Sequence, residues 1–251
     1  MVGIKSKEEI AIMKKAGNIV YKTHQYLKEY IKPGVTTLEL DSLAENYIRE
    51  NDAEPSFKGY QGFPNAICVS INDEVVHGIP SDRKLKEGDL VSIDIGACYK
   101  GYHGDSAWSY PVGKVSEETL YLLKHTKQAL YEGISRVKEG NTISDISKAI
   151  EEYAKSKKLG VIRELVGHGI GKNLHEQPDI PNYNTNDKLE LKEGMTIAIE
   201  PMLNLGTRNI YIEDNDWTIK TYDSKASAHF EHTVCVTKDG CDILTGEWLN
   251  G

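Results

Sequence analysis

The sequence predicts an α/β (α+β) fold in which helices cover a central, mainly antiparallel sheet made of two related halves. One short pattern occurs twice, 106 residues apart: LKEGDLVSIDIG begins at Leu85 and LKEGMTIAIEPM at Leu191. The same spacing relates IKPGVTTLELDSLAENYI at 31–48 to VKEGNTISDISKAIEEYA at 137–154. A constant spacing across two separate segments indicates a duplicated unit. We therefore expect residues 1–251 to form one domain built from two halves.

Helix signals occur twice in each half. A capping-box motif at Ser6–Glu9 precedes apolar residues at helical spacing, and Pro33-Gly34 interrupts that pattern. A second capping motif begins at Thr36. The predicted helices cover about 7–26, 36–49, 117–136 and 143–157.

Strands are predicted where apolar residues alternate with polar ones, or run together, between turn residues. They lie at about 66–72, 90–97, 161–166, 195–200 and 231–237. Residues 54–65, rich in glycine, proline and aromatic side chains, are expected to form a loop. No linker or low-complexity tract separates the halves, which favours one continuous sheet.

Composition restricts the class of protein. The net charge is −8 at pH 7 and no run of basic residues is present, which argues against a nucleic-acid partner. No apolar run approaches the ~18 residues that a membrane span needs, and the N-terminus lacks the apolar core of a signal peptide. The cysteines have no Cys-x-x-Cys spacing, as expected of reduced thiols. We expect a cytoplasmic monomer without membrane or nucleic-acid partners.

Acidic residues recur at equivalent places in the predicted strands. In LVSIDIG, apolar residues alternate with Ser92 and Asp94, so Asp94 points away from the covering helices. Glu200 lies 106 residues later, in the equivalent strand, and Glu231 begins a third strand. Carboxylates gathered on one face repel one another unless they share protons or bind a cation. One such acid alone is usually a surface residue, but the duplicated placement favours a metal site.

Two glycine-rich segments add further candidates. The segment 101–105 follows the Asp94 strand after a turn, so Asp105 can return beside Asp94. The segment 167–171 places His168 among glycines, where a backbone can approach a ligand closely; a tight turn with an incidental imidazole is the alternative. A carboxylate-rich site of this kind suits Mn²⁺, Fe²⁺ or Co²⁺ better than a structural zinc ion.

Seven motifs follow one another along nearly the whole chain. They are VHGIP with His77, IDIG with Asp94, GYHGD ending at Asp105, GHGIG with His168, LHE with His175, IEPM with Glu200 and FEHT with Glu231. As an ordered set they closely resemble the bacterial type I methionine aminopeptidases. The type II class carries a helical insertion between the histidine and glutamate ligands, and the 32 residues from His168 to Glu200 leave no room for it. The resemblance implies the pseudo-twofold "pita-bread" fold with a curved central sheet.

The resemblance also implies a centre of two divalent metal ions, Fe²⁺, Mn²⁺ or Co²⁺. The implied ligands are Asp94, Asp105, His168, Glu200 and Glu231. Asp94 and Glu231 would bridge the ions, and Glu200 would also act as general base for the water that attacks the scissile carbonyl. His77 and His175 would contact the substrate. The implied methionine pocket comprises Phe57, Tyr60, Phe63, Cys68 and Trp217, for which ordinary core packing is the alternative.

The implied activity is removal of the initiator methionine from nascent polypeptides near the ribosome, when the second residue is small. Two alternatives remain open. One is a proline-specific peptidase of the same fold; such enzymes usually carry a separate N-terminal domain, for which we expect no room in 251 residues. The other is a non-catalytic binding module; such modules typically lose metal ligands, whereas all five are present here.

Overall fold

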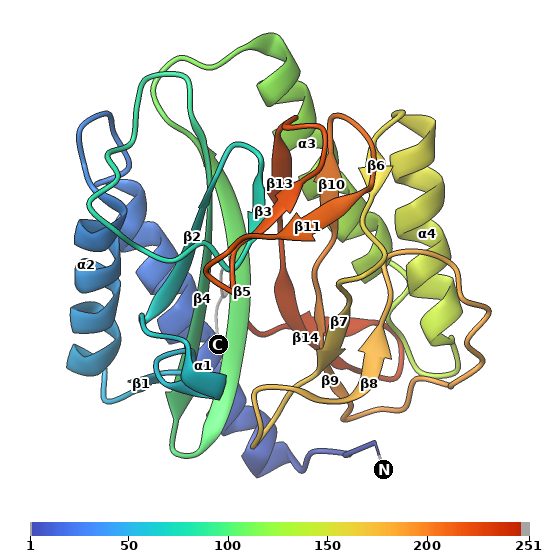
Figure 1. The fold of residues 1–251 in the computed structure, drawn as a ribbon. Coiled ribbons are helices and arrows are strands. Elements are labelled where there is room, and N and C mark those ends of the chain that lie inside the picture. Colours follow the sequence, from blue (N-terminus) through green and yellow to red (C-terminus); the bar gives the residue numbers. More distant parts are fainter. Residues whose placement is uncertain (1, 247–251) are drawn as a thin grey trace.

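A computed structural model describes residues 2–246 of the chain. Its long helices are α1 (Lys7–Lys28), α2 (Thr37–Glu50), α3 (Glu117–Ile134) and α4 (Ile143–Ser156). Each begins after a serine or threonine N-cap residue, as the capping motifs predicted. Figure 1 shows α1 and α2 (blue) against the strands of the first half, and α3 and α4 (green and yellow) against those of the second. The four helix predictions are confirmed. No helix within residues 2–246 is long and apolar enough to cross a membrane.

The first half is dominated by one long hairpin. Its sheet contains β1 (Glu54–Pro55), β2 (Ile67–Ile71), β4 (Leu90–Tyr99) and β5 (Tyr102–Pro111), all paired antiparallel. The two-residue loop between β4 and β5 has positive φ at both Lys100 (49°) and Gly101 (79°), the geometry that matches the twist of a tight hairpin. The predictions for 66–72 and 90–97 are confirmed. The loop predicted at 54–65 contains β1 and a single 3₁₀ turn, η1 (Tyr60–Gly62).

The second half has shorter strands. Its largest sheet has the order β15-β14-β9-β7-β8, from Cys241–Ile243, His232–Val236, Thr196–Ile199, Gly167–Gly169 and Glu176–Ile180. One small sheet joins β13 (Ser227–His229), β10 (Met202–Asn204) and β6 (Gly160–Val161). Another joins β11 (Ile210–Ile212), β12 (Ile219–Thr221) and β3 (Glu74–Val76). The predictions near 195–200 and 231–237 are confirmed. The strand predicted at 161–166 is wrong beyond Val161, because exposed Arg163 and Glu164 turn the chain toward solvent.

The strands form four hydrogen-bonded sheets, so the expectation of one continuous sheet is wrong. Between β5 and β14 no regular ladder forms, and the two strands are joined by individual side-chain and backbone bonds. Ser106 Oγ donates to Glu231 O over 2.6 Å, and Glu231 N donates to Ala107 O over 2.8 Å. The two halves therefore meet along a seam of specific contacts at the middle of the molecule.

The 106-residue spacing reappears in three dimensions. It relates α2 to α4 at both ends. An isolated β-bridge joins the N-cap residue of each of these helices to the segment before a central strand, Thr36 to Lys84 in one half and Thr142 to Glu190 in the other. Each half also packs its own apolar core under its helices. A cavity lies where the two repeats meet.

Candidate metal centre and substrate pocket

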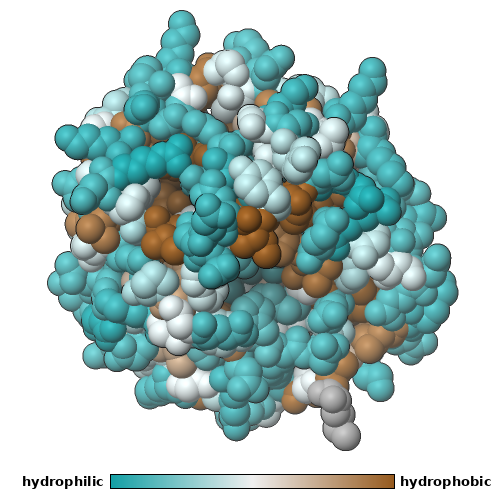
Figure 2. Space-filling model, in the orientation of Figure 1, coloured by the Kyte–Doolittle hydropathy of each residue, from teal (hydrophilic) through white to brown (hydrophobic). Residues whose placement is uncertain are grey.

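A cavity of about 160 Å³ opens between the two halves. Figure 2 shows a hollow near the middle of this face, with apolar residues gathered along its upper edge. The cavity is lined by every residue for which the sequence predicted a role: Phe57, Tyr60, Phe63, Cys68, His77, Asp94, Asp105, His168, His175, Glu200, Trp217 and Glu231. Gln61 and Leu174 complete the lining. The structure brings these residues together, while their individual roles stay predictions.

The β4–β5 hairpin places two aspartates on the cavity side. Asp94 pairs with Ala107, and Asp105 pairs with Gly96, two residues further along β4. Residues two apart on a strand share a face, as do cross-strand partners. Asp94 and Asp105 are therefore diagonal neighbours on the same face of a continuous ladder.

His168 lies in β7, between two glycines. A Cβ atom at Gly167 would lie 2.3 Å from Ala198 O, and one at Gly169 would lie 2.3 Å from Gln177 O. The absence of side chains at these glycines therefore lets the backbones of the neighbouring strands come close. The segment is a strand, so the alternative of a tight turn is wrong. His168 Nδ1 lies 2.8 Å from Gly169 O, which assigns its proton to Nδ1 and leaves the lone pair of Nε2 free to bind a cation.

The two glutamates lie just outside strand ends. Glu200 follows β9 directly, and Glu231 directly precedes β14. Thr233, two residues after Glu231, holds the backbone of Asp105 in the other half through two hydrogen bonds. Its hydroxyl accepts from Asp105 N (3.1 Å) and donates to Asp105 O (2.8 Å). Backbone segments from both repeats are thus locked together beside the acids.

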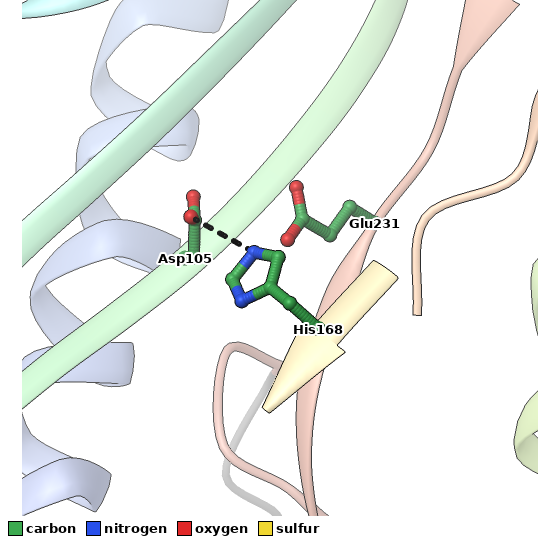
Figure 3. Close-up of side chains that lie close together, drawn as sticks. All are labelled: Asp105, His168 and Glu231. Carbon is green, nitrogen blue, oxygen red and sulfur yellow. Dashed lines mark ion pairs between the residues drawn. The ribbon is translucent and has the colours of Figure 1, made fainter. Parts of the chain in front are cut away.

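Three of the five predicted ligands have the spacing of ligands around a cation. Asp105, His168 and Glu231 each offer one ligand atom, and these atoms lie within 4.8 Å of one another. Figure 3 shows the two carboxylates and the imidazole directed toward a common space. His168 Nε2 lies 4.0 Å from Asp105 Oδ2 and 3.7 Å from Glu200 Oε1, too far for hydrogen bonds.

Several carboxylate oxygens at this centre have no protein partner. Among the described residues, the buried atoms Asp94 Oδ1, Asp105 Oδ1 and Glu231 Oε1 accept no hydrogen bond. Buried polar atoms are nearly always paired, so unpaired oxygens that converge on one space indicate a ligand that supplies the missing contacts. A set of carboxylate oxygens together with one imidazole nitrogen fits a divalent cation such as Mn²⁺, Fe²⁺ or Co²⁺.

The electrostatics of the centre disfavour a cluster of unprotonated acids without a cation. Burial raises the pKa of Asp94 to about 7. Burial, followed by repulsion from neighbouring carboxylates, raises the pKa values of Asp105, Glu200 and Glu231 well above their ordinary range. Burial lowers the pKa of His168 to about 4, so this imidazole is neutral at pH 7 and cannot offset the negative charge. The cluster must therefore retain protons or bind positive ions.

Two histidines line the cavity beside the acids. His77 has a left-handed backbone (φ 58°), an uncommon conformation for a non-glycine residue that tends to occur at functional sites. Its ring centroid lies 6.4 Å from that of Trp217, edge to face. His175 is exposed, and its Nδ1 lies 2.8 Å from the Tyr60 hydroxyl. Burial lowers the pKa of His77 to about 4, and partial desolvation of the His175 ring inside the cavity lowers the pKa of that histidine as well.

Apolar side chains form the other wall. The rings of Phe63 and Trp217 meet edge to face with centroids 5.0 Å apart. Phe57 packs directly on the backbone of β4, where a Cβ atom at Gly96 would lie 2.7 Å from the Phe57 ring. Burial raises the pKa of Cys68 well above its ordinary value, so this thiol is a neutral, polarisable wall group.

The structure adds one histidine that the sequence did not single out. His229, at the end of β13, is buried with its Nε2 atom 3.6 Å from Glu200 Oε2 and 3.9 Å from Glu231 Oε2. One signal was available, because His229 precedes Glu231 by two residues and so shares its side of an extended segment. His103 and His232 flank predicted ligands but bond elsewhere, to Ser56 Oγ and Thr245 Oγ1 respectively.

The chain is similar in sequence and fold to known metallopeptidases. The profile of metallopeptidase family M24 matches residues 11–238. Over 246 residues the chain is 52% identical to methionine aminopeptidase 1 of Bacillus subtilis, covering 98% of this chain and 99% of that protein. The crystal structure of methionine aminopeptidase from Rickettsia prowazekii matches with a TM-score of 0.96 and 40% identity, covering 98% of this chain and all of that one. A prolidase from Pyrococcus furiosus matches with a TM-score of 0.79 and 29% identity, over 98% of this chain and 66% of its own.

The chain therefore belongs to metallopeptidase family M24. The relatives that it matches end to end are methionine aminopeptidases, so within the family it is a metal-dependent aminopeptidase, a hydrolase. The predicted pita-bread fold is confirmed by the same structural matches. Family membership and the unpaired carboxylates agree in requiring a divalent metal.

Proposed function

We propose that this aminopeptidase removes methionine from the N-terminus of polypeptides whose second residue is small, with two divalent ions at its centre. One observation carries the proposal: a single cavity joins a carboxylate and imidazole cluster to an aromatic wall that contains a thiol. A flexible thioether side chain packs well against such a wall. Relatives named methionine aminopeptidase, at 52% and 48% identity over 98% of the chain, support the same substrate.

The proposed metal ligands are Asp94, Asp105, His168, Glu200 and Glu231, and the proposed ions are Mn²⁺, Fe²⁺ or Co²⁺. Divalent ions held by such a set lower the pKa of a coordinated water toward ~7 and polarise a carbonyl group. Asp94 and Glu231 come from different halves, so their sharing of both ions would tie the repeats together. The neutral Nε2 of His168 completes the set as the nitrogen donor.

Glu200 is the proposed general base. Its side chain is 14% exposed and lines the cavity, so it can reach an attacking water and afterwards the leaving amine. Burial, followed by repulsion from Asp94, raises its pKa well above the ordinary value. A carboxylate whose pKa is raised toward the working pH accepts and returns a proton more effectively.

His77 and His175 are the proposed substrate contacts. Both line the cavity beside the cluster of acids. Their lowered pKa values keep the imidazoles neutral at pH 7, able to donate one hydrogen bond to the scissile carbonyl oxygen or accept one from the substrate amine. The hydrogen bond between the Tyr60 hydroxyl and His175 Nδ1 would fix the orientation of that ring.

The proposed substrates are nascent polypeptides close to the ribosome, and the proposed location is the cytoplasm. The net charge of −8 argues against direct binding to nucleic acid. All four cysteines are free in the described structure, as in a reducing compartment. We propose that the enzyme acts as a monomer and without a membrane partner.

The proposal is tested by comparing cleavage of Met-Ala-Ser and Ala-Pro-Ala by the purified protein, after loading with Mn²⁺, Fe²⁺ or Co²⁺ in turn. We expect efficient release of methionine from the first peptide and little cleavage of the second. Faster cleavage of Ala-Pro-Ala would instead support the proline-specific alternative. No cleavage of either peptide by metal-loaded protein would favour a binding module. Metal content, measured on protein purified without chelators, tests the two-ion stoichiometry.

A further inference from the structure

We propose that His229 is a positioning residue of the metal centre, which donates a hydrogen bond from Nε2 to the carboxylates of Glu200 and Glu231. In doing so it sets the orientation in which these carboxylates bind cations. This inference rests on the metal centre proposed above and adds a residue outside the five proposed ligands.

The first argument is an unsatisfied atom. His229 is 2% exposed, and among the described residues its buried Nε2 has no hydrogen-bond partner. Leaving a buried donor unpaired is destabilising, so such atoms are rare unless they serve a function. The carboxylate oxygens that face Nε2 are Glu200 Oε2 at 3.6 Å and Glu231 Oε2 at 3.9 Å. Both distances exceed that of a hydrogen bond, and a shift of roughly 0.5 Å would bring the Glu200 oxygen within reach of Nε2.

The surroundings favour a donor over an additional ligand. Two carboxylate oxygens face Nε2, and a lone pair there would be repelled by both. An N–H group is attracted to them in the neutral ring and in the charged ring alike, so the argument does not depend on the charge of His229. Glu200 in particular lies between two imidazoles, with Oε1 toward His168 and Oε2 toward His229. One oxygen can thus be held by His229 while the other faces the His168 side of the centre.

The backbone of His229 is held as firmly as that of a ligand. Ser109 Oγ donates to His229 O over 2.8 Å and accepts from His229 N over 2.9 Å. The same two-bond arrangement joins Thr233 to Asp105, which is one of the proposed ligands. On its other side His229 pairs with Met202 in the β10–β13 ladder. A ring on so fixed a backbone can hold a carboxylate in one orientation.

The test uses three substitutions of His229 in the full chain. H229M removes the donor while filling the site with a flexible apolar side chain. H229Q places an amide N–H near the position of Nε2, whereas H229N places one near Nδ1. Each protein is stripped with a chelator and titrated with Mn²⁺ by calorimetry, and the visible spectrum of its Co²⁺ complex is recorded. H125M serves as the control, since His125 lies on α3 and bonds to Tyr153 on α4.

We expect H229M and H229N to bind Mn²⁺ about 10–100-fold more weakly, the usual effect of losing a group that orients a metal ligand. H229Q should bind close to wild type with an unchanged Co²⁺ spectrum, and H125M should bind as wild type. Metal-free H229M should melt at or above the wild-type temperature, because it no longer buries an unpaired donor.

Unchanged Mn²⁺ affinity in H229M would overturn the proposal. A weakened H229Q with an altered Co²⁺ spectrum would also overturn it and make His229 a direct ligand. Failure of the metal centre itself would look different: wild-type protein would bind no Mn²⁺, or Asp105→Asn would leave its binding intact. That result would remove the proposed function and the role of His229 together.

Discussion

The two repeats bring acids to the same cavity by different means. In the first half, Asp94 and Asp105 lie inside the continuous ladder of β4 and β5, each ten residues long. In the second half, Glu200 and Glu231 lie just outside the ends of β9 and β14, which have four and five residues. The shorter aspartate side chains on regular strands and the longer glutamate side chains at strand ends thus reach one centre. The 106-residue spacing relates only Asp94 to Glu200, because the positions equivalent to Asp105 and Glu231 are Tyr211 and His125.

The largest expected effect comes from removing one carboxylate charge in either half. Asp94→Asn and Glu231→Gln should each reduce turnover by at least the ~10²–10⁴-fold contribution of one acid–base group, and should lower the amount of bound metal. The two halves should be equally sensitive, because each carboxylate is proposed to contact both ions. Metal content by elemental analysis and turnover of Met-Ala-Ser provide the measurements.

The same two variants should remain folded without metal, since each relieves repulsion among buried acids. Their metal-free melting temperatures should equal or exceed that of wild type. Near-normal turnover of either variant after metal is restored would refute the two-ion assignment.

The next effect compares the two substrate-side histidines, again one from each half. His77→Ala and His175→Ala should each lower kcat/KM by about 10²–10⁴-fold while metal binding is unchanged. Tyr60→Phe is the matched control for His175, since it removes only the hydroxyl bonded to Nδ1. Its effect should be smaller. Loss of a metal ion from either alanine variant would show that a ligand had been given the wrong role.

A smaller effect is expected at the seam that joins the halves. Thr233→Val removes both bonds to the Asp105 backbone, and Ser109→Ala removes both bonds to the His229 backbone. Each leaves buried backbone groups unpaired, at a cost of about 1–3 kcal/mol per group. Urea unfolding of the metal-free proteins measures the loss in free energy of unfolding. A loss of stability in only one of the two variants would mean that the Thr233 and Ser109 contacts do not contribute equally to the seam.

The smallest effect is a pH dependence of metal-free stability. Burial raises the pKa of Asp94 to about 7, so the folded protein binds a proton that the unfolded chain releases; this contribution is lost as the pH rises through 7. Burial lowers the pKa values of His77 and His168 to about 4, so their contributions grow as the pH rises from 4 to about 6.5. Below pH 6.5 the effects of the acid and of the histidines on stability partly cancel. Above pH 6.5 only the effect of the buried acids changes with pH.

The melting temperature in chelator should therefore fall between about pH 6.5 and 8. Asp94→Asn should flatten this decrease, because it removes one of the groups that titrate in that window. Saturating Mn²⁺ should reverse the trend, since cations bind the deprotonated ligands. A melting temperature that rises over the same range in chelator would contradict the raised pKa values.

Regular strands made the first-half site the easier one to predict. Asp94 follows from the alternation in LVSIDIG, and the turn before Tyr102 returns Asp105 to it. Glu200 follows from the repeat. His229 was missed because its neighbours are distant in sequence: Ser109 holds its backbone and Glu200 faces its ring. The glycines around His168 were predicted to let the backbone approach a ligand, whereas they make room for the neighbouring strands, which come later in the chain.

The sequence by itself determined the helices, the duplicated plan and the residue types of the centre, because capping, periodicity and repetition are local properties of the chain. Only the tertiary structure decided how the halves meet. The two-bond contacts of Ser109 and Thr233, the unpaired oxygens and the position of His229 depend on which backbone lies opposite which. The raised pKa values have the same origin, since desolvation and repulsion arise only when distant acids are buried together. Pairing and burial are properties of the folded chain, and no local pattern encodes them.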